Sequence, residues 1–177
     1  MQPFRVEITP GAAILYPLLY FFDADGWFAA LLPGVILHEL GHAAALRLCG
    51  GKAASLRLEI TGLCLDILPL TSSAAEILCC LAGPAAGLLW IPLARTLPGV
   101  WWRKSADAAL VINLFNLLPA LPLDGGKALE LIARSRTALL WGSVFSAGVL
   151  TLAAWGSRRP ELLLPAGFLL FYAVRSA

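Results

Sequence analysis

The sequence predicts an all-α membrane protein with about six transmembrane helices and a small β-hairpin or sheet at the membrane surface. Apolar residues make up 59% of its 177 residues and charged residues only 14%, whereas soluble domains contain about 45–50% and about 25%. Several apolar runs approach the roughly 20 residues that a helix needs to cross a bilayer core. One segment instead alternates apolar and polar residues, which is typical of a strand.

The first elements are a short strand and a series of apolar helices. Phe4 to Ile8 alternates apolar and charged residues and predicts the strand, which Pro10-Gly11 ends. The first apolar run is short for a bilayer, and a turn at Asp23 to Gly26 separates it from the second. The predicted spans are residues 12–22, 27–48, 73–97, 106–121, 137–155 and 161–174.

Residues 54–68, between the second and third spans, predict a β-hairpin. Leu56 and Leu58 alternate with polar residues before Thr61-Gly62, and the alternation resumes after this turn. The exposed edge of such a hairpin either seals the protein surface or holds an extended peptide by strand addition. The pattern leaves both roles open.

The distribution of charge predicts the orientation of the chain in the membrane and argues against a nucleic-acid partner. The loops on the side of the two chain ends carry eight Lys and Arg residues, against five on the other side. Because cytoplasmic loops carry the excess of positive charge, we expect a multi-pass protein of the cell membrane with both termini in the cytoplasm. The net charge of +2 lacks a basic block, so no nucleic-acid partner is expected. We expect one domain over residues 1–177 and no cleavable signal peptide.

The motif His38-Glu39-Leu40-Gly41-His42 lies inside the second span and predicts a metal site. Residues four apart share one face of a helix, so the two imidazoles can bind one zinc ion. These are the only histidines in the chain. The same motif on a solvated face is often a coincidence. Here the surroundings are apolar, and a charged side chain in hydrocarbon costs about 2 kcal/mol or more, which favours a function.

A catalytic zinc ion usually has three protein ligands and one open position, so a third ligand is needed. Asp124 is the best-placed donor, because it lies behind an apolar span and at the helix break made by Pro119 and Pro122 before it and Gly125-Gly126 after it. Broken backbone at membrane depth is tolerated where it lines a cavity or is covered by protein. The alternative for Asp124 alone is an interfacial helix cap. The other donors are Asp66, Glu59, Glu76 and the four cysteines, which form no CxxC pair and are expected to be reduced packing residues.

This set predicts hydrolysis of a peptide bond in or near a transmembrane segment. Zinc would lower the pKa of its water toward about 7, and Glu39 would act as the general base. A substrate at this depth must be a membrane segment whose helix unwinds. Asn116, an amide in an apolar helix, would contact that backbone; a helix–helix hydrogen bond is an equal alternative. The small-residue run at 82–87 allows close approach of helices or substrate.

Three motifs resemble the site-2 protease family of intramembrane zinc metalloproteases: HELGH, AGPAAG and NLLPALPLDGG, in that order over roughly residues 30–135. Within the family the chain looks most like the compact bacterial branch related to the protease that processes a sporulation sigma-factor precursor. The resemblance implies one zinc ion per chain, held by His38, His42 and Asp124. It also implies Glu39 as catalytic base and Asn116 as a substrate contact. Many relatives have an asparagine where this chain has Gly87. The PDZ and nucleotide-sensing domains of other members are not expected here.

The expected partners are a membrane-embedded protein substrate and the lipid bilayer, while a homo-oligomer or a regulatory membrane protein is left open. A different class of function is a zinc-binding membrane protein without proteolysis, either a metal carrier or an inactive scaffold. Glu39 and the shielded broken helix argue against a carrier. A scaffold needs no buried HExxH motif.

Overall fold

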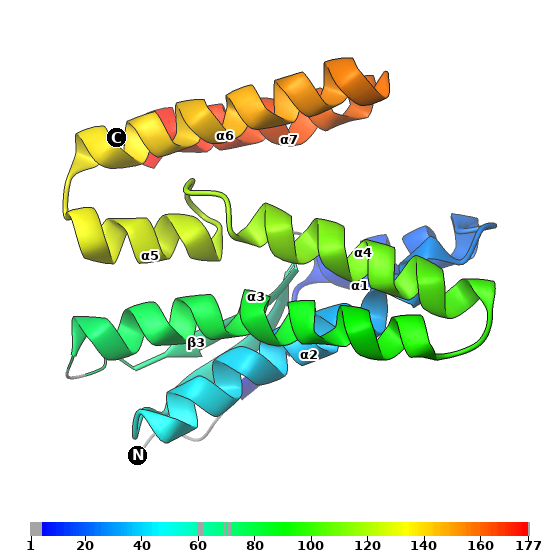
Figure 1. The fold of residues 1–177 in the computed structure, drawn as a ribbon. Coiled ribbons are helices and arrows are strands. Elements are labelled where there is room, and N and C mark those ends of the chain that lie inside the picture. Colours follow the sequence, from blue (N-terminus) through cyan, green and yellow to red (C-terminus); the bar gives the residue numbers. More distant parts are fainter. Residues whose placement is uncertain (1–4, 60–61, 69, 71, 177) are drawn as a thin grey trace. The chain divides into compact units, whose positions relative to one another are not determined.

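The computed structural model describes residues 5–59, 62–68, 70 and 72–176. The chain divides into two compact units, Met1–Asn113 and Leu114–Ala177, and each has its own packing. Among the described residues the first unit contains β1 Arg5–Ile8, α1 Pro10–Phe22, α2 Trp27–Leu48, β2 Ala53–Glu59, β3 Gly62–Ile67, α3 Ser73–Thr96 and most of α4 Val100–Asn116. Figure 1 shows α2 and α3 side by side, and this helix pair is the centre of the unit.

The predicted turn at residues 23–26 fixes the start of α2. The carboxylate of Asp23 accepts hydrogen bonds from the backbone N–H groups of Trp27 (2.9 Å) and Phe28 (2.6 Å). These are two of the donors that the first turn of a helix leaves without an internal partner. Gly26 precedes the helix with φ of 71°, a left-handed conformation that suits glycine. The bounds of α2 therefore coincide with the predicted second span.

The predicted hairpin is part of a three-stranded sheet. β2 pairs with β3 in antiparallel register, with Leu56 opposite Leu65, and β1 pairs with β2 in parallel, with Val6 opposite Leu56. The predicted first strand thus covers one edge of the hairpin. Phe4, Ile60 and Thr61, which the predictions included, lie outside the described residues. Tyr16 of α1 donates a hydrogen bond to the carbonyl of Glu59 (2.9 Å) and ties the first helix to the sheet.

The six predicted spans are not confirmed. Within the described ranges, three helices are long and apolar enough to cross a membrane, α2, α3 and α6. α4 runs from Val100 to Asn116 rather than over 106–121 and has 17 residues. It ends early because Pro119 and Pro122 lack the backbone N–H that a continuing helix needs. α1 has 13 residues and α7 has 14.

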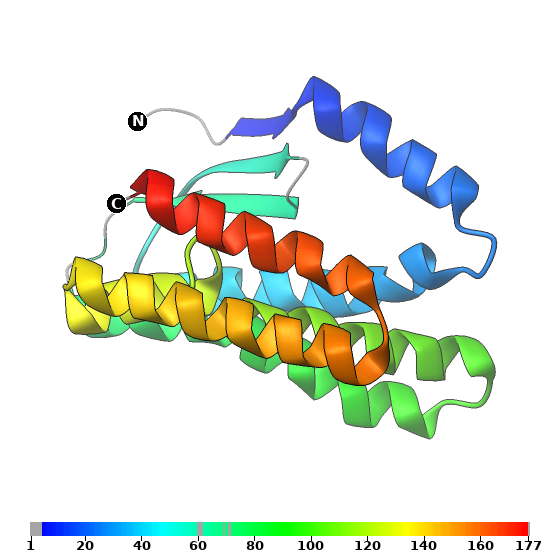
Figure 2. The same ribbon diagram turned by 90° about the horizontal axis from the view of Figure 1, so that it is seen from above.

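The second unit is built on a helical hairpin. After the end of α4 its elements are α5 Asp124–Ala133, α6 Arg136–Ser157, the 3-10 helix η1 Pro160–Leu162 and α7 Leu163–Ser176. α6 and α7 lie along each other in both Figure 1 and Figure 2. The segment between the predicted fourth and fifth spans, residues 122–136, is largely helical, as α5.

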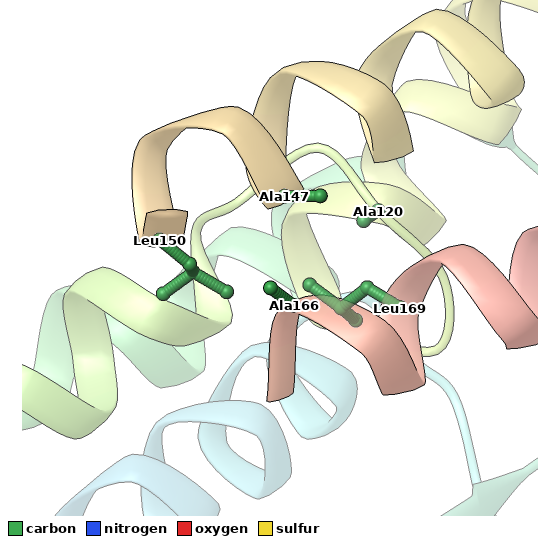
Figure 3. Close-up of a cluster of buried hydrophobic side chains, with 5 residues drawn as sticks. All are labelled: Ala120, Ala147, Leu150, Ala166 and Leu169. Atoms are coloured by element: carbon green, nitrogen blue, oxygen red, sulfur yellow. The ribbon is translucent and has the colours of Figure 1, made fainter. Parts of the chain in front are cut away.

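An apolar cluster anchors the loop of residues 117–123 in this unit. Figure 3 shows side chains of α6 and α7 gathered around Ala120 of that loop. Leu118 and Leu123 of the loop pack against the same cluster. The backbone just before Asp124 is thereby held by α6 and α7. The cluster consists of Ala120, Ala147, Leu150, Ala166 and Leu169.

Candidate metal centre

His38 and His42 of α2 are brought together as the sequence predicts. Their Nε2 atoms are 3.0 Å apart, and the ring centroids are 4.7 Å apart with an interplanar angle of 81°. His38 is buried, with 6% of its surface exposed, and His42 is partly buried. Each ring therefore directs its Nε2 atom toward a common point beside the helix.

The other ring nitrogen of each histidine faces an oxygen acceptor. His38 Nδ1 lies 2.8 Å from Oδ1 of Asn113, and His42 Nδ1 lies 2.7 Å from the carbonyl oxygen of Cys79 on α3. The amide nitrogen of Asn113 donates to the carbonyl of Ala109 (2.7 Å), so its oxygen is the atom that faces His38. Both Nδ1 atoms must then be the donors. In the neutral rings both Nε2 atoms consequently carry a lone pair.

This arrangement fits a zinc ion. Two lone pairs 3.0 Å apart repel each other, and a cation bound by both nitrogens removes that repulsion. Two Zn–N bonds of about 2.0–2.1 Å at a tetrahedral angle would place the nitrogens about 3.3 Å apart, close to the observed separation. Metal-binding histidines almost always donate their second ring N–H to a carbonyl or carboxylate. Both rings are held in this way.

The predicted small-residue run on α3 makes room for the site. A Cβ atom at Gly83 would overlap the His42 ring, and one at Gly87 would overlap the side chain of Asn113. On α2, a Cβ atom at Gly41 would overlap the carbonyl oxygen of Ala82. The close approach of α2 and α3 therefore depends on glycine at these positions.

The remaining predicted donors of the first unit are engaged elsewhere. Glu59 forms an ion pair with Arg57 (2.9 Å), and Glu76 accepts from the backbone N–H of Leu70 (3.2 Å). Cys49 and Cys79 belong to the apolar packing between α2 and α3, as predicted for the cysteines. The side chain of Asp66 lies outside the described residues. Glu39 follows His38 on α2 and is half-buried.

Asp124 and Asn116 belong to the second unit. Asp124 is the first residue of α5 and is buried, with 7% of its surface exposed. Its Oδ1 lies 3.2 Å from Nζ of Lys127, one turn along the helix. The N-cap residue of α5 is Leu123, so Asp124 is not the N-cap residue of this helix. Asn116 is the last residue of α4 and is half-buried.

Sequence reasoning missed Asn113, the residue that contacts His38. A signal was present, because Asn113 is an amide inside the same apolar run and lies one helical turn before Asn116. The contact itself depends on how α4 packs beside α2, which periodicity does not reveal.

Comparison with known proteins identifies the family. No family model matches the chain. The chain is 33% identical to Rip3 of Mycobacterium tuberculosis in an alignment of 139 positions that covers 68% of this chain; Rip3 is provisionally named a zinc metalloprotease and is matched in two strains. The match spans 34% of Rip3, so this chain corresponds to about a third of that relative. The structure resembles the site-2 protease of Methanocaldococcus jannaschii with a TM-score of 0.64 and 21% identity, over 99% of this chain and 91% of that one.

This chain is a member of the site-2 protease family. The family predicted from the HELGH, AGPAAG and NLLPALPLDGG motifs is confirmed, as is the mostly helical membrane fold with a small sheet. The narrower assignment to the branch related to the sporulation protease stays a prediction.

Proposed function

We propose that this site-2 protease family member is a zinc-dependent endopeptidase that hydrolyses a peptide bond in or near a transmembrane segment of a membrane protein. The observation that carries the proposal is the pair of histidine Nε2 atoms 3.0 Å apart inside an apolar helix, each ring held by an acceptor at Nδ1. In a histidine pair with only a structural role, two neutral rings placed in this way would leave their Nε2 lone pairs repelling each other.

The proposed ligand set is His38, His42 and Asp124, with one zinc ion per chain. Asp124 is favoured because its side chain is buried, and because its backbone is anchored by the apolar cluster of α6 and α7. Two imidazoles and a carboxylate are a common ligand set of catalytic zinc. When bound, the zinc ion would supply Lewis acidity, which polarises a carbonyl group and makes a water molecule more acidic.

Glu39 is the proposed general base. Its carboxylate takes a proton from the attacking water as the water oxygen bonds to the scissile carbonyl carbon. It then gives this proton to the departing amine as the C–N bond breaks. Asn116 is the proposed hydrogen-bond partner of the unwound substrate backbone. An edge of the sheet remains a candidate for binding the extended substrate by strand addition, and β3 is one of the two edge strands.

The proposed setting is the cell membrane, with both termini in the cytoplasm. Helices α2, α3 and α6 are long enough to cross a bilayer, and a substrate reaching the buried histidines would itself be embedded in the membrane. The charge bias of the loops supports the orientation. A homo-oligomer or a regulatory membrane protein stays an open partner, and a zinc carrier or inactive scaffold stays the competing function.

Replacing Glu39 by Gln separates these functions. Glutamine keeps nearly the same shape but cannot accept the proton, so cleavage of a membrane-embedded reporter in liposomes should fall about 10²–10⁴-fold. Zinc content, measured on the same sample, should be unchanged. Glu161→Gln makes the same chemical change on an exposed turn and should leave cleavage intact. Full activity with full zinc in Glu39→Gln would contradict the mechanism.

Alanine substitutions test the ligand set. His38→Ala, His42→Ala and Asp124→Ala should each lose zinc in elemental analysis of the purified protein, because three protein ligands are the usual minimum for such a site. Full zinc in Asp124→Ala would remove Asp124 from the metal centre while leaving the histidine pair in place.

A further inference from the structure

We propose that Asn113 is a positioning residue that fixes the tautomer and orientation of His38. We also propose that glycine is required at position 87 because only glycine leaves space for the Asn113 side chain. This inference rests on the proposed zinc site. It assigns a role to a residue that touches neither the proposed metal nor the proposed substrate, and acts only through the His38 ring.

Asn113 is fully buried, with 0% of its surface exposed, and both ends of its amide are used. Its nitrogen donates to Ala109 on its own helix at 2.7 Å, and its oxygen faces Nδ1 of His38 at 2.8 Å. The first bond prevents the amide from turning over, since a flip would set its oxygen against the Ala109 carbonyl. The amide therefore presents an acceptor, and only an acceptor, to the histidine.

A fixed acceptor at Nδ1 determines which nitrogen of His38 can bind a metal. With the proton held on Nδ1, the lone pair is on Nε2, the atom that converges with His42. Without Asn113, the proton can move to Nε2 and the ring can rotate about its side-chain bonds. Either change removes the lone pair from the common point.

Gly87 of α3 completes the arrangement. A Cβ atom at this position would overlap the oxygen, nitrogen and carbon atoms of the Asn113 amide. A larger residue would therefore push the amide away from His38. The AGPAAG run thus serves both histidines, because Gly83 faces the His42 ring and Gly87 faces the residue that holds His38.

Zinc affinity of the purified chain in detergent, measured by chelator competition, tests the proposal. Asn113→Leu keeps the bulk but removes the acceptor, and should weaken zinc binding about 10–100-fold. Asn113→Asp keeps an oxygen acceptor for the Nδ1–H but loses the hydrogen bond to the Ala109 carbonyl, so its zinc affinity should lie between those of Asn113→Leu and wild type. The matched control is Ser105→Ala, which changes another buried polar residue of α4 and removes the hydrogen bond that Trp90 on α3 donates to it (2.9 Å). Equal losses in Asn113→Leu and Ser105→Ala would reduce Asn113 to a general packing role and overturn the inference.

Gly87→Ala separates positioning from packing. Alone, it should lower both the thermal midpoint and the zinc affinity, because the amide is displaced. The double variant Gly87→Ala/Asn113→Ala removes the overlap, so the thermal midpoint should recover while the zinc affinity stays low. Recovery of both quantities would show that only packing matters, and would overturn the inference.

The two possible failures are distinguishable. If wild type binds zinc tightly and Asn113→Leu binds it equally well, the positioning role falls and the proposed function stands. If the wild-type chain binds no zinc, both fall together.

Discussion

The helix pair α2–α3 and the helix pair α6–α7 are both rich in glycine and alanine, but their glycines differ in how closely other atoms approach them. At Gly41, Gly83 and Gly87 of the first pair, a Cβ atom would overlap a neighbouring backbone or side chain. At Gly148 and Gly167 of the second pair, a Cβ atom would meet nothing within 4 Å. Small residues in membrane helices are therefore not one class, because some admit a functional side chain and others are simply replaceable.

Gly142 of α6 is the exception that explains the contrast. A Cβ atom there would overlap the carbonyl oxygen of Pro119, in the loop that leads to Asp124. Gly83, Gly87 and Gly142 thus face His42, Asn113 and the loop before Asp124, whereas Gly34 and Gly41 face Ala109 and Ala82. Three of the crowded glycines in these helix pairs therefore contact segments that carry the proposed chemistry, and the other two allow close helix packing.

The largest effect is expected from Gly83→Ala. The added methyl group would overlap the His42 ring and move its Nε2, so zinc affinity should fall by about 100-fold, the upper range for disturbed ligand orientation. Chelator competition measures the affinity, and cleavage of the membrane reporter should fall with it. Unchanged affinity would mean that α3 can shift without cost and that the crowding at this position has no functional meaning.

An intermediate effect is expected from Gly142→Ala. The methyl group would push against Pro119, and overpacking of this kind costs about 1–3 kcal/mol of stability. Unfolding in mixed detergent micelles, followed by circular dichroism, measures this loss. A free energy of unfolding equal to that of wild type would show that the 117–123 loop yields freely at this contact.

The smallest effect is expected from Gly148→Ala. The position is exposed and open, and alanine favours a helix over glycine by up to about 1 kcal/mol. The same unfolding measurement should therefore show an unchanged or slightly raised stability, with zinc affinity equal to wild type. A clear loss of stability would reveal a partner on this face and would end the contrast between the two helix pairs.

Local signals predicted much of the first unit well. The apolar run and its flanking turn locate α2, the four-residue spacing brings His38 and His42 together, and alternation finds the hairpin. Each of these features depends on residues that are close together in the sequence, so it can be predicted without knowing which distant segments become neighbours.

Contacts between distant segments were not predictable in the same way. The pairing of β1 with β2, the acceptor role of Asn113 and the need for glycine at position 87 each depend on which elements become neighbours. An apolar helix offers several faces of similar hydropathy, so its pattern does not say which face meets which partner. The early start of α4 was missed, because Pro98 to Lys104, with Trp101 and Trp102, was interpreted as a loop at the lipid–water interface.

The two histidines also differ in how readily natural variation can disturb them. The acceptor of His42 is the main-chain carbonyl of Cys79, a group that every amino acid supplies. Position 79 can therefore change to any residue that fits beside Ala45 and Leu46. The acceptor of His38 is a side chain, and few residue types can offer an oxygen at that reach. A selection for activity from libraries randomised at each position should recover a broad set of small residues at 79 and a narrow set at 113.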